Sequence, residues 1–251
     1  MTHKGHEVLE YWDCKNVASM YDKHLLGLEI DLVSAQIRPN SKILDAGCGE
    51  GEGTAVYARI PGVNIHAVDF SDTRLAKAAE RLRECKNVLL KKVDFLSTYQ
   101  LDRDYDYVIS QRFLINLMEW DLQKKVLSDL KSLLRPGGRF VMLEGSAEGV
   151  ATLNNVRNAF GLEPIPVKWH NLFFIDSVLT KFMASEGFRL IQEDGLGEYF
   201  FLTRGIRPYF DKELNWDSAF NALAASSGTR SVLQLKDKFS RLKLWVFEKG
   251  S

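Results

Sequence analysis

The segment that most constrains this chain is Asp45-Ala46-Gly47-Cys48-Gly49-Glu50-Gly51, in which glycines alternate with other residues. The run 42–45 has the character of a short buried strand, and the run 54–60 after the glycines has that of a helix. Glycines at such a junction let the backbone approach a ligand closely, and the helix start offers free N–H groups. A plain tight turn is the alternative, but the flanking strand and helix favour a ligand-binding loop.

Strands and helices are predicted to alternate after this loop, which indicates an α/β fold with a doubly wound, mostly parallel sheet. Ser71 or Asp72 is expected to cap one helix, and Arg135-Pro136-Gly137-Gly138 to end another. An amphipathic region, 8–37, comes before the loop, and 195–228 has no clear pattern. The predicted strands are 63–68, 87–93, 105–110, 139–143, 188–193 and 239–247, and the predicted helices are 73–85, 121–134, 151–160 and 176–185.

Charge and cysteine content limit the classes of function. Lys+Arg and Asp+Glu both number 33, so the basic excess typical of nucleic-acid binding is absent and no nucleic-acid partner is expected. Neither a signal peptide nor a membrane-spanning run is predicted, and Cys14, Cys48 and Cys85 match neither a disulfide framework nor a zinc site. We expect a reduced, cytoplasmic chain that acts on a small molecule as a monomer or homodimer.

The spacing of the glycines argues against a dinucleotide. A G-x-G-x-x-G pattern would need its third glycine at Glu52 or Thr54. Asp45 is a poor neighbour for a pyrophosphate but a good one for a ligand ammonium. Asp69 ends the next strand, where a carboxylate can accept both ribose hydroxyls, although a helix cap is its alternative role. Asp94-Phe95 follows the third strand and can bind an adenine amino group and cover its ring.

These motifs, with Leu134-Arg135-Pro136-Gly137-Gly138-Arg139 before the fifth strand, resemble the class I S-adenosylmethionine-dependent methyltransferases over residues 15–145. The resemblance implies a Rossmann-like sheet of seven strands, in which a last, antiparallel strand comes from 242–247. It also implies S-adenosylmethionine as cofactor and S-adenosylhomocysteine as product. We expect one methyltransferase domain over 1–251, with an N-terminal helical cover (1–40), a cofactor-binding core (41–145), and an acceptor-side cap insertion with C-terminal strands (146–251).

The resemblance also implies individual cofactor contacts. Gln111 and Arg112 would lie at the sulfonium end, and Tyr21 would close over the methionine carboxylate. The place after the fourth strand reads Ser110-Gln111-Arg112-Phe113 and lacks the Asn/Asp-Pro-Pro-Tyr signature, which disfavours adenine-amine and glutamine acceptors. No acidic set suggests a metal. The full set of expected cofactor residues is Tyr21, Asp45, Gly47, Cys48, Gly49, Asp69, Phe70, Arg74, Asp94, Phe95, Gln111 and Arg112.

The acceptor side rests on less specific signals. Segments 112–117 and 166–171 resemble a bacterial subgroup linked with surface-sugar modification, so O-methylation of a sugar or sugar-linked metabolite is expected. His170 is the candidate base, Glu144 would orient a hydroxyl or the histidine, and Arg112 is the third candidate catalytic residue. Expected acceptor contacts are Trp12, Asn116, Asn154, Trp169, Asn171, Arg204 and Tyr209, of which Arg204 and Tyr209, together with Arg207, would reach an anionic group such as a phosphate.

Each of these assignments has a structural alternative. His170 would then be hydrogen-bonded within its loop, Arg112 would be an ion-pair partner, and Arg204 and Tyr209 would lie on the surface. At the level of function the alternatives are N-methylation of a small amine, a nicotinamide-dependent oxidoreductase, which the glycine spacing opposes, and a cofactor-binding subunit without catalysis.

Overall fold

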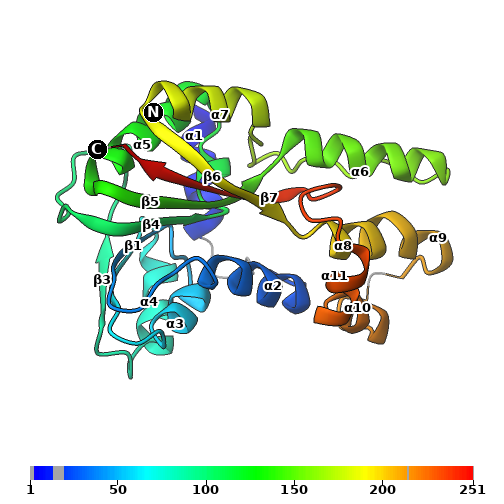
Figure 1. Cartoon of the computed structure of the whole chain (residues 1–251), viewed down its shortest axis with the longest axis horizontal. Coiled ribbons are helices and arrows are strands. Elements are labelled where there is room, and N and C mark those ends of the chain that lie inside the picture. Colours follow the sequence, from blue (N-terminus) through cyan, green and yellow to red (C-terminus); the bar gives the residue numbers. More distant parts are fainter. Residues whose placement is uncertain (1–2, 14–19, 214, 251) are drawn as a thin grey trace.

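The computed structural model describes residues 3–13, 20–213 and 215–250, and it shows a twisted sheet with helices on both faces (Figure 1). Seven strands lie in the order β3-β2-β1-β4-β5-β7-β6. Cys14 falls outside the described residues, and the thiols of Cys48 and Cys85 are free. The strands are β1 (Lys42–Ala46), β2 (Asn64–Asp69), β3 (Val88–Lys92), β4 (Tyr105–Gln111), β5 (Leu134–Gly145), β6 (Phe188–Gly195) and β7 (Leu242–Lys249).

The strand directions confirm the predicted fold. Strands β1 to β5 pair in parallel, whereas β7 runs antiparallel to both β5 and β6. The chain moves outward from β1 to β3 and then returns to β4 on the other side of β1. This reversal opens a crevice beyond the carboxyl ends of β1 and β4, the usual place for a ligand in open α/β sheets.

Alternating side chains of the strands build two hydrophobic layers, one on each face of the sheet. Along β5, Phe140 and Met142 pack in the cluster that contains side chains of α5 and α7, whereas Val141 and Leu143 pack in the cluster of α2 and α3. The helices are α1 (His3–Asp13), α2 (Lys23–Ser34), α3 (Glu52–Tyr57), α4 (Asp72–Arg81), η1 (Leu114–Asn116), α5 (Trp120–Leu133), α6 (Ala147–Ala159), α7 (Asp176–Ser185), α8 (Gly197–Phe200), η2 (Phe201–Ile206), α9 (Arg207–Phe210), α10 (Ala219–Ala224) and α11 (Ser227–Leu233).

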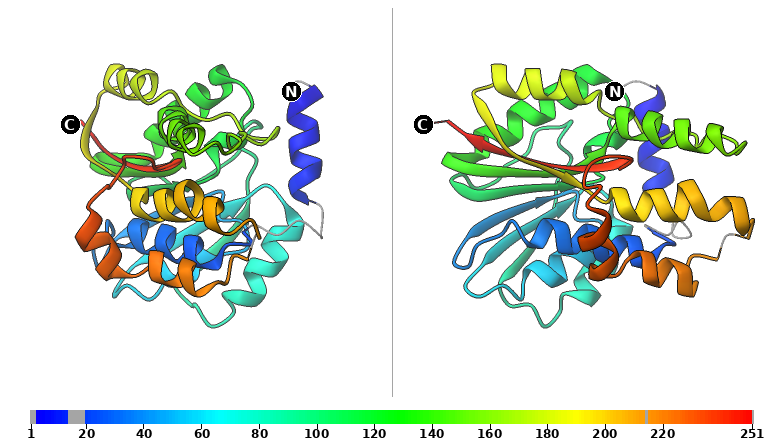
Figure 2. Two further views of the ribbon diagram at one scale, coloured as in Figure 1. Left: turned by 90° about the vertical axis from the view of Figure 1, so that its right-hand side faces the viewer. Right: turned by 45° about the vertical axis from the view of Figure 1, so that its right-hand side comes forward.

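The second half of the chain extends past the carboxyl edge of the sheet. Helix α6 and the α8–η2–α9 segment project beyond the ends of the strands, and α1 stands beside α4 at another edge (Figures 1 and 2). Segment η2 is a π-helical turn, which hydrophobic periodicity does not reveal. Among the described helices, none has the length and apolar character that crossing a membrane requires.

Glu144, at the end of β5, joins the sheet to the turn that follows β4. Its buried carboxylate accepts hydrogen bonds from the Ser110 hydroxyl (2.5 Å) and from the backbone N–H groups of Phe113 (3.1 Å), Leu114 (3.0 Å) and Ile115 (3.4 Å). Burial raises the pKa of Glu144 to about 7, and these donors oppose the rise. The carboxylate therefore caps η1 from a neighbouring strand, because no side chain caps that helix locally.

Glu144→Ala should lower the free energy of unfolding by about 2–4 kcal/mol, because it strands buried N–H donors without an acceptor. Urea denaturation would measure the loss. Ser110→Ala is the matched control, since it removes one donor and leaves the carboxylate its backbone partners, and it should cost only about 1 kcal/mol. Equal losses for the two variants would show that Glu144 does not hold the turn.

Candidate active site

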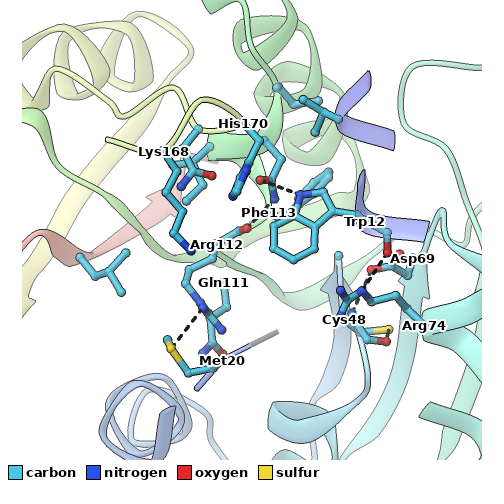
Figure 3. A pocket seen from close by; sticks show the side chains of 18 of the residues that line it. Trp12, Met20, Cys48, Asp69, Arg74, Gln111, Arg112, Phe113, Lys168 and His170 are labelled. Carbon is cyan, nitrogen blue, oxygen red and sulfur yellow. Dashed lines mark hydrogen bonds between the residues drawn. The ribbon is translucent and has the colours of Figure 1, made fainter. Parts of the chain in front are cut away.

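A cavity of about 460 Å³ opens at the carboxyl ends of β1, β2 and β4. Its lining comes from the strand ends, from α1 and α2, and from the segment that carries Lys168 and His170 (Figure 3). All of the cofactor residues expected from the sequence border it: Tyr21, Asp45, Gly47, Cys48, Gly49, Asp69, Phe70, Arg74, Asp94, Phe95, Gln111 and Arg112.

The glycine loop bends tightly along the floor of this cavity. Gly47 and Gly49 have φ angles of 74° and 55°, the left-handed region that other residues rarely adopt. A Cβ atom on Gly47 would lie 2.6 Å from the Phe113 side chain, whereas one on Gly49 would meet no atom within 4 Å. Gly49 therefore leaves open space beside its backbone, and the loop fits a ligand that comes close to the main chain.

Two carboxylates flank the loop. Asp69 accepts hydrogen bonds from the backbone N–H of Gly49 (2.9 Å) and of Ser71 (3.0 Å), so it fixes both the loop and the start of α4. Asp45 accepts a hydrogen bond from the Thr54 hydroxyl at 2.6 Å. Burial raises the pKa of Asp45 to about 6, and the negative charge of Asp69 adds to the rise. Such a pair suits a ligand with an ammonium group and hydroxyl donors, and it would repel a pyrophosphate.

The edge of the cavity near β2 and β3 is held by side chains of α1 and α4. Ser71 caps α4, as the sequence predicts. Arg74 pairs with Glu50 (2.9 Å), donates to the Trp12 carbonyl (3.2 Å) and lies 5.0 Å from the Trp12 ring centroid. Asp94 accepts hydrogen bonds from the Leu96 N–H and the Ser97 hydroxyl. The contacts of Arg74 with Trp12 hold α1 against α4 beside the cavity.

At the end of β4 a buried network surrounds Glu29, a residue that the sequence analysis did not single out. Gln111 donates to Glu29 (2.8 Å) and accepts from Tyr57 (3.1 Å), while Arg112 pairs with Glu29 at 3.1 Å. Burial raises the pKa of Glu29, and the Arg112 charge opposes that rise. Arg112 adopts a left-handed φ of 53°. Its guanidinium is thus an ion-pair partner that also lines the cavity.

His170 lies in an aromatic group that borders the cavity (Figure 3). Its ring stacks on Tyr11 with centroids 4.4 Å apart, and the rings of Trp12 and Trp169 approach edge-on at 5.3 Å. The residue is 3% exposed, and neither ring nitrogen hydrogen-bonds to any described residue. Burial, with the charge of Lys168 adding to it, lowers the pKa of His170 below its ordinary 6.5. The imidazole is therefore neutral at neutral pH.

Several expected acceptor residues also border the cavity, namely Trp12, Asn116, Asn171 and Arg204. The Trp12 indole donates to Asn116 at 3.1 Å. Arg204 donates to the carboxylate of Asp22, which caps α2 and accepts from the Tyr199 hydroxyl at 2.8 Å. Arg204 also lies over the Trp216 ring.

Other expected site residues, namely Glu144, Asn154, Trp169 and Tyr209, are not part of the cavity lining. Glu144 is 0% exposed and bonded to the η1 turn, and no hydrogen bond joins it to His170 among the described residues. Asn154 bonds both the N–H and the carbonyl of Ile165 and so secures the segment before His170. Trp169 and Tyr209 are 57% and 56% exposed. Trp169 packs edge-on against His170, which lines the cavity, and Tyr209 packs against Phe160.

Other lining residues were not identified from the sequence. Arg241 belongs to no motif and reaches the cavity because distant segments pack together. Glu29, which belongs to no motif either, lies behind the lining and is bonded to Gln111 and Arg112. Asp22 and Lys168 also line the cavity, and their positions beside the predicted residues Tyr21 and His170 are the sequence signal that could have identified them. Among residues 3–13, 20–213 and 215–250, no cluster of His, Cys, Asp and Glu is arranged to hold a metal ion.

Comparison with known proteins supports this description. Residues 43–138 match the family described as "Methyltransferase domain". The chain is 28% identical over 186 residues to a ubiquinone/menaquinone biosynthesis C-methyltransferase of Vibrio parahaemolyticus, covering 71% of this chain and 70% of that protein. It is 33% identical over 107 residues to phosphoethanolamine N-methyltransferase 2 of Caenorhabditis elegans, covering 42% and 24%. Across the quinone-biosynthesis relatives, the match spans about two thirds of their length.

A solved structure shows the same fold over the whole chain. The N-methyltransferase NodS of Bradyrhizobium japonicum, in complex with S-adenosyl-L-homocysteine, has a TM-score of 0.60 at 13% identity and covers 99% of this chain and 100% of its own. The open space at Gly49 and the paired carboxylates suit the same cofactor in this cavity. Residues 43–138 therefore carry a methyltransferase domain, and the chain has the fold of a methyltransferase solved with S-adenosyl-L-homocysteine.

Proposed function

We propose that the glycine loop holds the methionine part of S-adenosylmethionine and that Asp45 attracts its ammonium. Asp69 accepts the ribose hydroxyls, and Asp94 with Phe95 binds the adenine. Tyr21, 68% exposed at the cavity rim, covers the methionine part. In support, all of these residues border one cavity, and Asp69 already fixes the loop that it would share with the ligand.

We propose further that the chain O-methylates a small polar acceptor, a sugar or sugar-linked metabolite. The observation that carries this proposal is the buried, neutral His170 beside the β4 end of the cavity. A hydroxyl becomes a strong nucleophile only as it loses its proton, so a nearby unprotonated imidazole is the expected base. Asn116 and Asn171 offer polar contacts near it.

The chemistry divides between donor and protein. When bound, S-adenosylmethionine supplies an electrophilic methyl group on a sulfonium. The protein aligns the acceptor oxygen and excludes water. The hydroxyl proton would pass to His170 as the oxygen–methyl bond forms and the methyl–sulfur bond breaks, which would leave S-adenosylhomocysteine as the second product. The stacked ring of Tyr11 limits rotation of the imidazole.

C-methylation of an electron-rich ring is the second candidate. It is favoured by the named activity of the quinone-biosynthesis relatives and by the aromatic and aliphatic side chains in the cavity wall, which include Trp12, Phe113, Phe173 and Phe200. In this reaction His170 would take a proton from a ring hydroxyl and so raise the electron density at the attacked carbon.

A methyl-transfer screen separates the two candidates. The purified protein would be given labelled S-adenosylmethionine with sugar nucleotides, phosphorylated sugars, small amines and phenols, and the product's methylated atom would be assigned by NMR. An oxygen–methyl product on a sugar supports the proposal. A carbon–methyl product on a ring supports the second candidate, and a nitrogen–methyl product would overturn both.

Asp69→Ala should weaken S-adenosylhomocysteine binding by on the order of a hundredfold, because the ribose loses a charged acceptor and the N–H of Gly49 loses its partner. Isothermal titration calorimetry would measure the dissociation constant. Asp72→Ala, which removes an exposed carboxylate at the start of α4, should leave the dissociation constant unchanged. Undiminished binding by Asp69→Ala would refute the ribose assignment.

Cofactor affinity should fall at acid pH through Asp45. Because its pKa is about 6 without ligand, the carboxylate form that attracts an ammonium is lost as pH drops below 6, and the dissociation constant should rise up to about tenfold per pH unit. Calorimetry with S-adenosylhomocysteine between pH 5 and pH 8 would show this slope. Asp45→Asn should bind more weakly at pH 8 and with a flatter profile; a flat profile in the wild type would contradict the assignment.

His170→Gln should lower kcat by about 10²–10⁴-fold, the usual contribution of a general base, and should leave S-adenosylhomocysteine affinity near normal. Since only the neutral imidazole accepts a proton and its pKa lies below 6.5, the wild-type kcat should fall as pH decreases below that value. The variant should lack this acid limb. A variant that keeps both the rate and the limb would exclude His170 as the base.

A further inference from the structure

Arg241 lies in the wall of the cavity on the acceptor side. It comes directly before β7, whose first residue, Leu242, pairs with Gly145 at the carboxyl end of β5. Strand β7 is two places from β4 in the sheet. Neighbouring strands are about 4.8 Å apart, so the backbone of Arg241 lies roughly 10 Å to the side of the β4 end, where Gln111 and Arg112 lie. The glycine loop, after β1, is one strand farther away.

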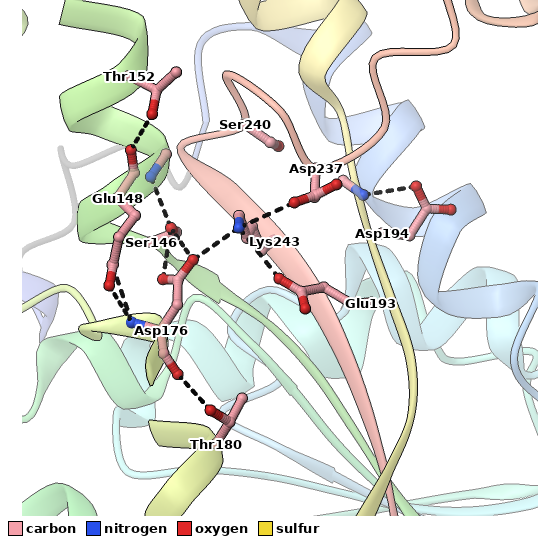
Figure 4. A network of polar contacts seen from close by, with 12 residues as sticks. Ser146, Glu148, Thr152, Asp176, Thr180, Glu193, Asp194, Asp237, Ser240 and Lys243 are labelled. Carbon is pink, nitrogen blue, oxygen red and sulfur yellow. Dashed lines mark hydrogen bonds and ion pairs between the residues drawn. The ribbon is translucent and has the colours of Figure 1, made fainter. Parts of the chain in front are cut away.

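The backbone of Arg241 is rigidly held. Its carbonyl accepts the N–H of Ser146 at 3.0 Å. Two residues later, the buried ammonium of Lys243 contacts the carboxylates of Asp176 (2.7 Å), Glu193 (3.2 Å) and Asp237 (3.2 Å), as Figure 4 shows. This network fixes the start of β7 between α7 and β6, so the Arg241 side chain leaves from a fixed point.

The other arginines of the cavity already have carboxylate partners. Arg112 pairs with Glu29, and Arg204 pairs with Asp22. Arg241 differs, because among the described residues its guanidinium has no hydrogen bond or ion pair and only faces the Phe173 ring, 5.4 Å from the centroid. Burial, with the nearby charges of Arg204 and Arg112, lowers the pKa of Arg241 to about 10, and the charge of Glu29 opposes this fall without forming an ion pair. It still carries its charge at neutral pH.

A partly buried positive charge without a partner is unfavourable, and a ligand anion would relieve it. Lys168 adds a second cation to the same cavity, and Figure 3 shows its side chain extending inward from the segment that carries His170. Among the described residues no carboxylate pairs with Lys168 either. The uncompensated positive charge is thus on the side of the cavity near His170, away from the Asp45–Asp69 pair.

We infer that Arg241 is the anion-binding residue of the acceptor pocket and that the acceptor carries a phosphate or carboxylate group. This inference rests on the proposed function, because it assigns the acceptor of the same cavity. It also replaces the sequence-based assignment of the anion site. Arg204 is paired with Asp22, Arg207 bonds the carbonyls of Glu213 and Asn215, and Tyr209 lies outside the cavity lining.

The binding test uses inorganic phosphate as the probe on the protein saturated with S-adenosylhomocysteine. Phosphate should raise the melting temperature relative to chloride at equal ionic strength, and Arg241→Gln should raise the half-saturating phosphate concentration about tenfold or more. Arg241→Lys keeps the charge and should retain most of the response. Arg189→Gln, on the exposed side of β6, is the control and should behave as wild type.

Two results would overturn the inference. One is an Arg241→Gln protein that responds to phosphate as the wild type does. The other is a loss of S-adenosylhomocysteine affinity in Arg241→Gln of tenfold or more, because the guanidinium would then bind the cofactor's own carboxylate.

The methyl-transfer assay separates this inference from the proposed function. Each sugar would be offered with and without its phosphate, and the phosphorylated form should have the lower KM in the wild type but not in Arg241→Gln, with kcat changed much less. Transfer that ignores the phosphate would overturn the inference and leave the proposed function standing. No transfer to any sugar would instead overturn the proposed function, while the phosphate response would still report on Arg241.

Discussion

The parallel alignment of β1, β2 and β4 is the constraint on which the site depends. Because their carboxyl ends meet at one edge, the residues that follow each strand are brought around a single cavity although up to 67 positions separate Asp45 from Arg112. Asp69 then ties two of these strand ends together through the N–H groups of Gly49 and Ser71. The donor half of the site is therefore built by the sheet itself, and little of it depends on the later part of the chain.

This explains why residues that border one cavity could be predicted from the sequence. Most of them lie at or just after the end of a strand that hydrophobic runs and turn residues indicate, so a strand-end position is enough to place Asp45, Asp69 or Gln111 near the others. The sequence did not predict which contacts these side chains make within the folded protein. Gln111 does not stand free but bridges Tyr57 and Glu29, and Glu29 comes from a helix whose apolar pattern gives no sign of a buried acid.

The acceptor side could not be predicted in the same way, because its residues come from loops and from helices that no periodic pattern marks. Asn154 and Glu144 resemble site residues in the sequence, since both are polar and close to the ligand-facing edge. In the fold their hydrogen bonds are used within the protein, on Ile165 and on the η1 turn. Arg204 comes from a π-helical turn within the stretch that had no clear pattern. Polar residue type alone therefore does not distinguish a side chain that contacts the acceptor from one whose hydrogen bonds stabilise the fold.

Charge balance is a better guide to the two halves of the cavity. The side with the glycine loop carries Asp45 and Asp69, and burial raises the pKa of both, so it favours a cationic ligand. On the opposite side each buried carboxylate, Asp22 and Glu29, is already matched by an arginine, which leaves Arg241 in excess. A cationic methyl donor and an anionic acceptor would each neutralise the side that it occupies. Their own attraction would then draw them together across the cavity, beside the proposed base His170.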